Sequence, residues 1–115
     1  MMPTPVPFEA HIAHLDGNAL VVVRGEIDME TFLAFRTVLE QARAETPHLM
    51  IDMSEVTFCS SSGLGALLFA VNRVGETGSV TIRRPHPAVL RLLEITGVTG
   101  QFTIDVDEPL PAPAA

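Results

Sequence analysis

The residues of this 115-residue chain best suited to do chemistry are three consecutive serines at positions 60–62, followed by Gly63. They stand between an apolar run that ends at Cys59 and a run with helical spacing that begins near Leu64. This order predicts several hydroxyl groups at a point where a strand ends and a helix begins. A phosphate placed there would meet free backbone N–H groups and the positive end of the helix dipole.

One reading of the serine junction is a phosphorylation switch. A phosphoserine carries roughly −1.5 to −2 charges near neutral pH, and the start of a helix tolerates that charge. A partner packed over the same point would meet a bulky dianion and be repelled. A simpler reading is helix capping, because a serine hydroxyl at an N-cap satisfies an otherwise unpaired N–H.

A catalytic reading of the junction has weaker support. A nucleophile elbow has the pattern Gly-x-Ser-x-Gly, whereas Ser61 has Cys59 two residues before it and Gly63 two after it. The candidate bases are His11, His14, His48 and His86, and no spacing pairs any of them with Ser61. A phosphate-binding loop of the P-loop type is also disfavoured, because all 7 basic residues of the chain are arginine and such a loop needs lysine.

Composition narrows the class of partner. The chain has 14 acidic and 7 basic residues, so its formal charge is −7, which disfavours nucleic acid or an anionic membrane as partner. A lone cysteine excludes an internal disulfide and is typical of a reducing compartment. The N-terminus lacks the features of a signal peptide, and the densest apolar stretch, 64–71, is shorter than the ~20 residues of a membrane helix. We therefore expect a cytoplasmic protein.

The rest of the chain reads as one α/β domain over residues 8–106, between a disordered arm at 1–7 and a Pro/Ala-rich tail at 107–115. Strands are expected at 8–14, 19–24, 49–53, 80–83 and 101–106. Three helices are expected: one from Asp28 as N-cap to Pro47, one from the serine junction to Gly75, and one from Pro87 to Gly97. The first two strands should form a hairpin, and the second should be buried on both faces. The helical connections predict parallel pairing in a sheet of about five strands with helices packed on it.

Two further features have structural explanations. His11 and His14 lie three apart in a strand and so point to opposite faces, which disfavours a shared metal ion. Cys59 is better explained as a small core residue than as a redox centre. We expect neither a metal nor a cofactor.

Three segments together resemble one known family. They are Val21-Val22-Val23-Arg24-Gly25-Glu26-Ile27-Asp28, the stretch 49–68 that contains the serine junction, and Pro87-Ala88-Val89-Leu90-Arg91-Leu92-Leu93-Glu94-Ile95-Thr96-Gly97-Val98. In this order, over roughly residues 8–106, the chain resembles the STAS domain and, within it, the stand-alone bacterial anti-sigma factor antagonists. The resemblance implies a mixed sheet with helices mainly on one face.

The resemblance also implies a mechanism, which is partner switching without catalysis by this chain. The unphosphorylated antagonist binds an anti-sigma factor that is also a serine kinase, and this frees a sigma factor. The kinase phosphorylates a serine at the start of the second helix, binding is lost, and a serine phosphatase restores it. The alternative is a scaffold or sensor-linked STAS domain that works in a larger assembly without phosphorylation.

The family motif at the phosphorylation site is Asp-Ser-(Ser/Thr)-Gly, which places the phosphoacceptor at Ser61 when aligned on Gly63. The position of the family's aspartate is held by Ser60, which makes Ser60 a rival acceptor, and Ser62 is a further alternative. A diverged antagonist that binds without being phosphorylated also stays open. The residues that the resemblance assigns to the partner-binding surface are Glu26, Asp28, Ser60, Ser61, Ser62, Gly63 and Leu64.

Overall fold

The computed structural model describes residues 6–106 of the chain. Its elements follow one another in the order β1 (Glu9–Leu15), β2 (Asn18–Ile27), α1 (Phe32–Glu45), β3 (His48–Cys59), α2 (Ser61–Val74), β4 (Ser79–Arg83), α3 (Pro87–Thr96), a 3-10 turn (Thr99–Gln101) and β5 (Thr103–Asp105). The predicted arm at 1–7 and tail at 107–115 lie mostly outside the described residues.

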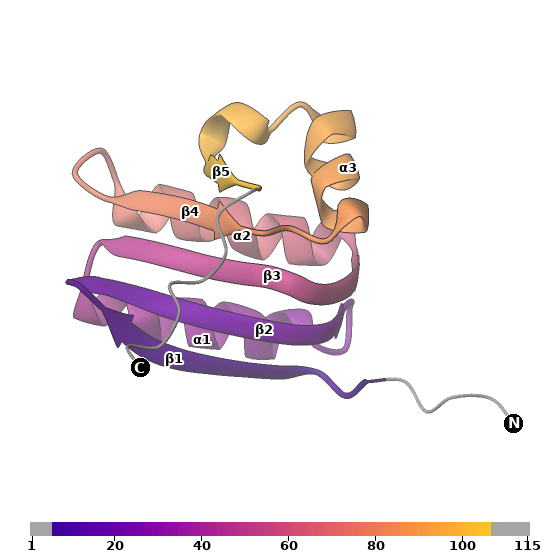
Figure 1. The fold of residues 1–115 in the computed structure, drawn as a ribbon, viewed down its shortest axis with the longest axis horizontal. Coiled ribbons are helices and arrows are strands. Elements are labelled where there is room, and N and C mark those ends of the chain that lie inside the picture. Colours follow the sequence, from indigo (N-terminus) through magenta and orange to yellow (C-terminus); the bar gives the residue numbers. More distant parts are fainter. Residues whose placement is uncertain (1–5, 107–115) are drawn as a thin grey trace, which may run out of the picture.

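The five strands form one sheet in the order β1-β2-β3-β4-β5 (Figure 1). β1 and β2 form the predicted antiparallel hairpin, with Leu15 opposite Asn18. The pairs β2–β3, β3–β4 and β4–β5 are all parallel. Because β2 and β3 are parallel, their carboxyl ends meet at the same edge of the sheet, where Ile27 is paired with Cys59.

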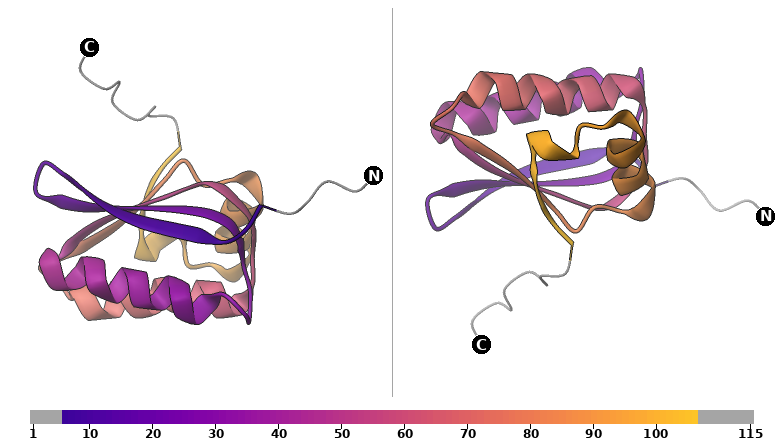
Figure 2. Two further views of the ribbon diagram at one scale, coloured as in Figure 1. Left: turned by 90° about the horizontal axis from the view of Figure 1, so that it is seen from below. Right: turned by 90° about the horizontal axis from the view of Figure 1, so that it is seen from above.

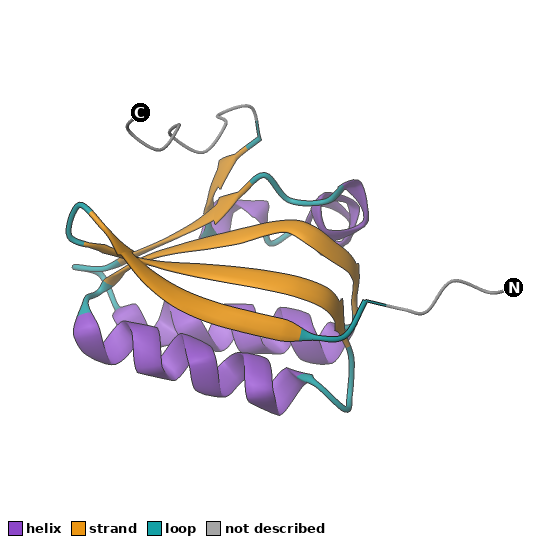
Figure 3. Ribbon diagram, turned by 60° about the horizontal axis from the view of Figure 1, so that its bottom comes forward, coloured by secondary structure: helices purple, strands orange, loops and turns teal. Residues whose placement is uncertain are grey.

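The helices cover mainly one face of this sheet. α1 and α2 lie side by side on the same side of the strands (Figures 2 and 3). α3 packs against the part of β3 that extends beyond β4, where the His86 N–H donates to the Met53 carbonyl at 3.2 Å. The α/β architecture expected from the sequence is thus confirmed. Within the described part of the chain, no helix is both long and apolar enough to cross a bilayer.

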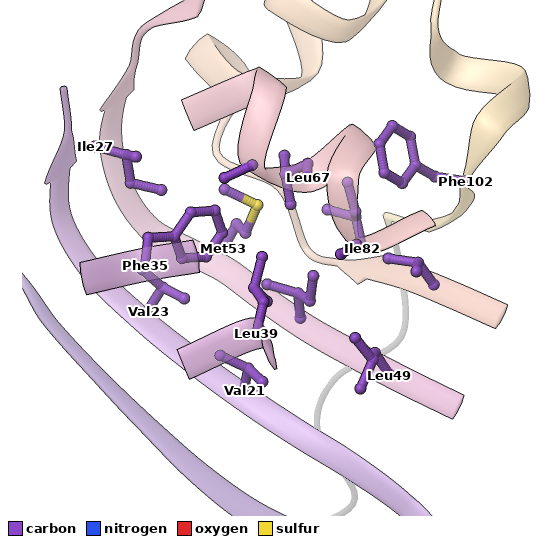
Figure 4. Packing of buried hydrophobic residues seen from close by; sticks show 14 of the residues in the cluster. Val21, Val23, Ile27, Phe35, Leu39, Leu49, Met53, Leu67, Ile82 and Phe102 are labelled. Carbon is purple, nitrogen blue, oxygen red and sulfur yellow. The ribbon is translucent and has the colours of Figure 1, made fainter. Parts of the chain in front are cut away.

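The hydrophobic core fills the space between the sheet and the two long helices (Figure 4). Val21 and Val23 of β2 face this core and are fully buried, as are Phe35 of α1 and Leu67 of α2. The alternate residues of β2 are only partly buried. The expectation that β2 is buried on both faces was therefore wrong, because no helix among the described residues covers the second face.

Two strands continue further than the sequence pattern indicated. β2 runs to Ile27 and β3 runs to Cys59, and the pairing between them shifts at two irregular positions. Gly25 lies at one of these shifts with φ of +93°, and a Cβ there would approach the Pro7 carbonyl to 2.9 Å. The predicted strand ends followed the apolar runs at 19–24 and 49–53, and polar residues such as Glu26 and Glu55 lie just beyond these runs. Both strands nevertheless continue past them to the serine junction.

We expect the contact between α1 and the sheet to contribute strongly to the stability of the fold. Phe35 is fully buried, so Phe35→Ala should lower the free energy of unfolding by about 3–5 kcal/mol through lost burial and the cavity left behind. Leu33 on the same helix is 60% exposed, so Leu33→Ala should change it by less than about 1 kcal/mol. Urea denaturation of both variants measures the difference, and equal losses would contradict this account of the core.

Candidate functional site

The serine junction connects the end of β3 to the start of α2. Ser60 is the N-cap of α2, with an extended backbone, and its Oγ accepts a hydrogen bond from the Gly63 N–H at 3.3 Å. The Ser60 N–H donates in turn to the Ile27 carbonyl of β2 at 2.8 Å. Ser60 therefore holds the first turn of the helix to the neighbouring strand, which confirms the capping reading for this one serine.

Gly63 brings the first turn of α2 into close contact with the sheet. A Cβ at this position would stand 2.6 Å from Cγ2 of Ile27 and 2.7 Å from Sγ of Cys59. Such contacts are far shorter than a van der Waals contact, so no larger residue fits without a shift of the helix or of the Ile27 and Cys59 side chains. Because Gly63 has no side chain, the start of α2 can lie close against the ends of β2 and β3. This close contact fixes the position of the serines relative to the strand ends.

The other junction residues divide into exposed and buried ones. Ser61, the first residue of α2, is exposed, and Ser62 is partly buried. Gly63 and Leu64 are buried beneath them. The Ser61 residue is therefore exposed to solvent, while Gly63 and Leu64 pack against the domain beneath it.

The loop after β2 is held by its own hydrogen bonds. Oδ1 of Asp28 accepts from the N–H groups of Glu30 at 2.9 Å and Thr31 at 3.2 Å, and the Thr31 hydroxyl donates to the Glu26 carbonyl at 2.9 Å. α1 itself begins at Phe32, with Thr31 as its N-cap. The prediction that Asp28 caps the helix was therefore wrong, since Asp28 instead closes the turn that precedes it.

Glu26 and Asp28 lie at the same edge of the sheet as the serine junction. Glu26 is exposed and paired across the strands with Phe58, whose side chain is 47% exposed. Asp28 follows Ile27, which is paired with Cys59. The structure thus brings together the acidic loop and the serines, as the parallel pairing of β2 and β3 requires.

The thiol of Cys59 lies beneath this surface. The residue is 8% exposed, and burial raises the pKa of the thiol to about 11. The thiol therefore stays protonated at neutral pH, which does not suit a redox-active cysteine. The interpretation of Cys59 as a core residue is supported.

The histidines considered as catalytic bases have other neighbours. Nδ1 of His48 is 3.0 Å from Oγ of Ser79, and Nδ1 of His86 accepts from the Ala88 N–H at the start of α3 at 3.1 Å. His14 contacts Glu45 at 2.6 Å. Among residues 6–106 no histidine hydrogen-bonds to a junction serine, and no cluster of three or more potential metal ligands occurs. The geometry gives no support to a hydrolase.

A pocket that sequence reasoning missed opens between α1 and α2 beside the serines. Its volume is about 290 Å³, and it is lined by Phe32, Arg36, Ser62, Gly65, Ala66 and Phe69. The guanidinium of Arg36 lies over the ring of Phe69, with Cζ 3.9 Å from the ring centre. The sequence held no signal for this pocket, because only the packing of α1 beside α2 brings the two residues together.

These features define a small α/β domain with an exposed hydroxyl on a well-packed junction. A family model described as "Mlab, STAS domain" matches residues 10–106, and the chain therefore belongs to the STAS domain family. The resemblance seen in the sequence is confirmed.

Individual relatives are also similar to this chain. The anti-sigma-F factor antagonist RsfB of Mycobacterium tuberculosis is 33% identical over 94 residues, which cover 74% of this chain and 77% of the relative. The anti-sigma F factor antagonist of Paenibacillus polymyxa is 27% identical over 93 residues, covering 78% of this chain and 80% of the relative. The crystal structure of an anti-sigma factor antagonist from Mycobacterium paratuberculosis has a TM-score of 0.82 and 30% identity, with 90% of each chain covered.

The two glycines near the start of α2 should respond oppositely to alanine. Gly63→Ala forces Cβ against Ile27 and Cys59 and should lower the free energy of unfolding by about 1–3 kcal/mol. A Cβ at Gly65 meets nothing within 4 Å, so Gly65→Ala should raise that free energy by about 0.5–1 kcal/mol through helix propensity. Chemical denaturation tests both, and a Gly63→Ala protein as stable as the parent would refute the close packing.

Alanine substitutions of Ser60 and Ser61 should likewise have different effects on the free energy of unfolding. Ser60→Ala removes the hydrogen bond to the Gly63 N–H and should cost about 1 kcal/mol of stability. Ser61→Ala removes an exposed hydroxyl and should stay within about 0.5 kcal/mol of the parent. Thermal and urea unfolding check this order, which would be reversed if Ser61 were the true cap.

Proposed function

We propose that this protein is an anti-sigma factor antagonist that binds an anti-sigma factor with serine kinase activity and is released when Ser61 is phosphorylated. The observation that carries the proposal is the position of Ser61, exposed at the first residue of α2 on a junction held by Ser60 and Gly63. The antagonists similar to this chain support the partner class.

The phosphorylation step needs only a hydroxyl from this chain. Oγ of Ser61 attacks the γ-phosphorus of ATP held by the kinase, a new O–P bond forms, and the bond from that phosphorus to ADP breaks. The hydroxyl proton passes to a base of the kinase. The product is a phosphoserine at the start of α2, where the helix dipole favours negative charge and the fold is preserved. A serine phosphatase reverses the step by hydrolysing the O–P bond to release phosphate.

Ser61 is a better acceptor than Ser60 on structural grounds. Oγ of Ser60 already accepts the hydrogen bond from Gly63, and Ser60 is less exposed. Ser60 occupies the position of the family's aspartate and still caps the helix, so the first turn keeps its structure without the acid. This supports a junction that remains competent for phosphorylation although one negative charge is missing.

The surface around Ser61 favours a basic partner. Exposed Glu26 and partly buried Asp28 lie on the neighbouring loop, and the whole chain carries a formal charge of −7. A positive patch on the partner would be drawn to this edge of the sheet. A phosphate on Ser61 would then weaken partner binding through its bulk, because it prevents close packing at the centre of the interface with the partner.

Binding and phosphorylation can be tested together with the purified partner. The full chain is mixed with its anti-sigma factor kinase and Mg-ATP, and the phosphate is mapped by mass spectrometry. Phosphate should appear on Ser61, be lost from that position in Ser61→Ala and persist there in Ser60→Ala. Ser61→Asp should weaken binding to the kinase by at least about 30-fold, since the larger, hydrated side chain would break the close packing at the centre of the contact.

The opposite results would favour the alternative function, a scaffold or sensor-linked STAS domain that is not phosphorylated. An unmodified junction after incubation with a kinase that binds tightly would remove the switch. A stable large assembly of the isolated chain on size-exclusion chromatography, together with that result, would favour a scaffold or sensor-linked domain. Phosphate confined to Ser60 would keep the switch and move its acceptor.

A further inference from the structure

Arg36 differs from the other arginines of the α1–α2 surface in its contacts. Arg43 and Arg73 both pair with Glu40, at 3.0 and 3.3 Å. The hydrogen bond from Arg43, together with Arg73, lowers the pKa of Glu40 and keeps this carboxylate ionised. Its negative charge is compensated by the two guanidinium groups. Arg36 instead lies over the Phe69 ring and, within residues 6–106, has no carboxylate within ion-pair distance. Its charge is therefore available to an anion.

The pocket described above is lined by this arginine and also by a serine of the junction. Arg36 and Ser62 line the same cavity of about 290 Å³ between α1 and α2, and Ser61 is not among its lining residues. Gly65 forms part of the lining, and even an added Cβ there would meet no atom within 4 Å. The cavity thus has room for a phosphate group on Ser62.

We propose that Ser62 is a second phosphorylation site whose phosphate is bound within the molecule by Arg36. A guanidinium can form two parallel hydrogen bonds to phosphate oxygens, and such charge-assisted pairs are stronger than neutral ones. The cation comes from α1, so the contact does not depend on the end of α2 alone. The proposal rests on the proposed function only in that a kinase must reach the start of α2.

The two adjacent serines would then give different outputs. A phosphate on Ser61 projects into solvent and faces an approaching partner. A phosphate on Ser62 turns into the α1–α2 pocket, draws Arg36 from the Phe69 ring, and leaves less uncompensated charge at the docking edge. Phosphorylation at Ser62 should therefore weaken partner binding less than phosphorylation at Ser61.

Direct installation of phosphoserine tests the contact without any kinase. Full-length protein carrying phosphoserine at position 62 or 61, introduced by codon suppression, is titrated by phosphorus NMR. The second pKa of the phosphate at 62 should lie at least about half a unit below that at 61, since a nearby opposite charge stabilises the dianion. Arg36→Gln should remove most of this difference and leave the phosphate at 61 unchanged.

Arg73→Gln is the matched control, because Arg73 also lies near the Phe69 ring, at 5.9 Å, but pairs with Glu40. It should leave the phosphate at 62 unaffected. Insensitivity of that phosphate to Arg36→Gln, or an equal response to Arg73→Gln, would overturn the proposal. Thermal unfolding of each variant verifies that the fold is intact. Because no kinase enters this experiment, its failure is distinct from failure of the kinase to modify Ser61.

Discussion

The close approach of α2 to the sheet at Gly63 is the constraint on which the rest of the structure depends. Ile27 and Cys59 occupy the space that a side chain at position 63 would need. The Ser60 N–H closes the same contact by donating to the Ile27 carbonyl. One missing Cβ and one hydrogen bond therefore tie the start of α2 to the ends of β2 and β3.

This constraint explains why the serine junction and the acidic loop after β2 gather at one edge of the sheet. Parallel pairing brings the carboxyl ends of β2 and β3 together, and the pairing continues past two irregular positions near Gly25 and Glu55 as far as the junction. The loop containing Asp28 is then held beside the serines by hydrogen bonds of its own. The exposed hydroxyl of Ser61 therefore stands on a well-packed base.

The charge distribution divides this surface into two parts. The loop after β2 carries Glu26 and Asp28, whereas on the α1–α2 side Arg43 and Arg73 pair with Glu40 and Arg36 lies over the Phe69 ring. A chain with a formal charge of −7 thus has an arginine in the groove that Ser62 also lines. Ser61 does not line this groove, so the two neighbouring serines have different surroundings.

The sequence by itself determined the order of the elements, the hairpin, the parallel connections and the place of the serine junction, because hydrophobic periodicity and turn residues act locally. It placed the ends of β2 and β3 and the start of α1 wrongly, since the irregular pairing of the two strands and the Asp28 turn depend on neighbouring strands and loops. Only the tertiary structure decided which serine caps, which is exposed, and which shares a pocket with Arg36. These distinctions arise from helices that are distant in sequence and become neighbours only when both pack on the same sheet face.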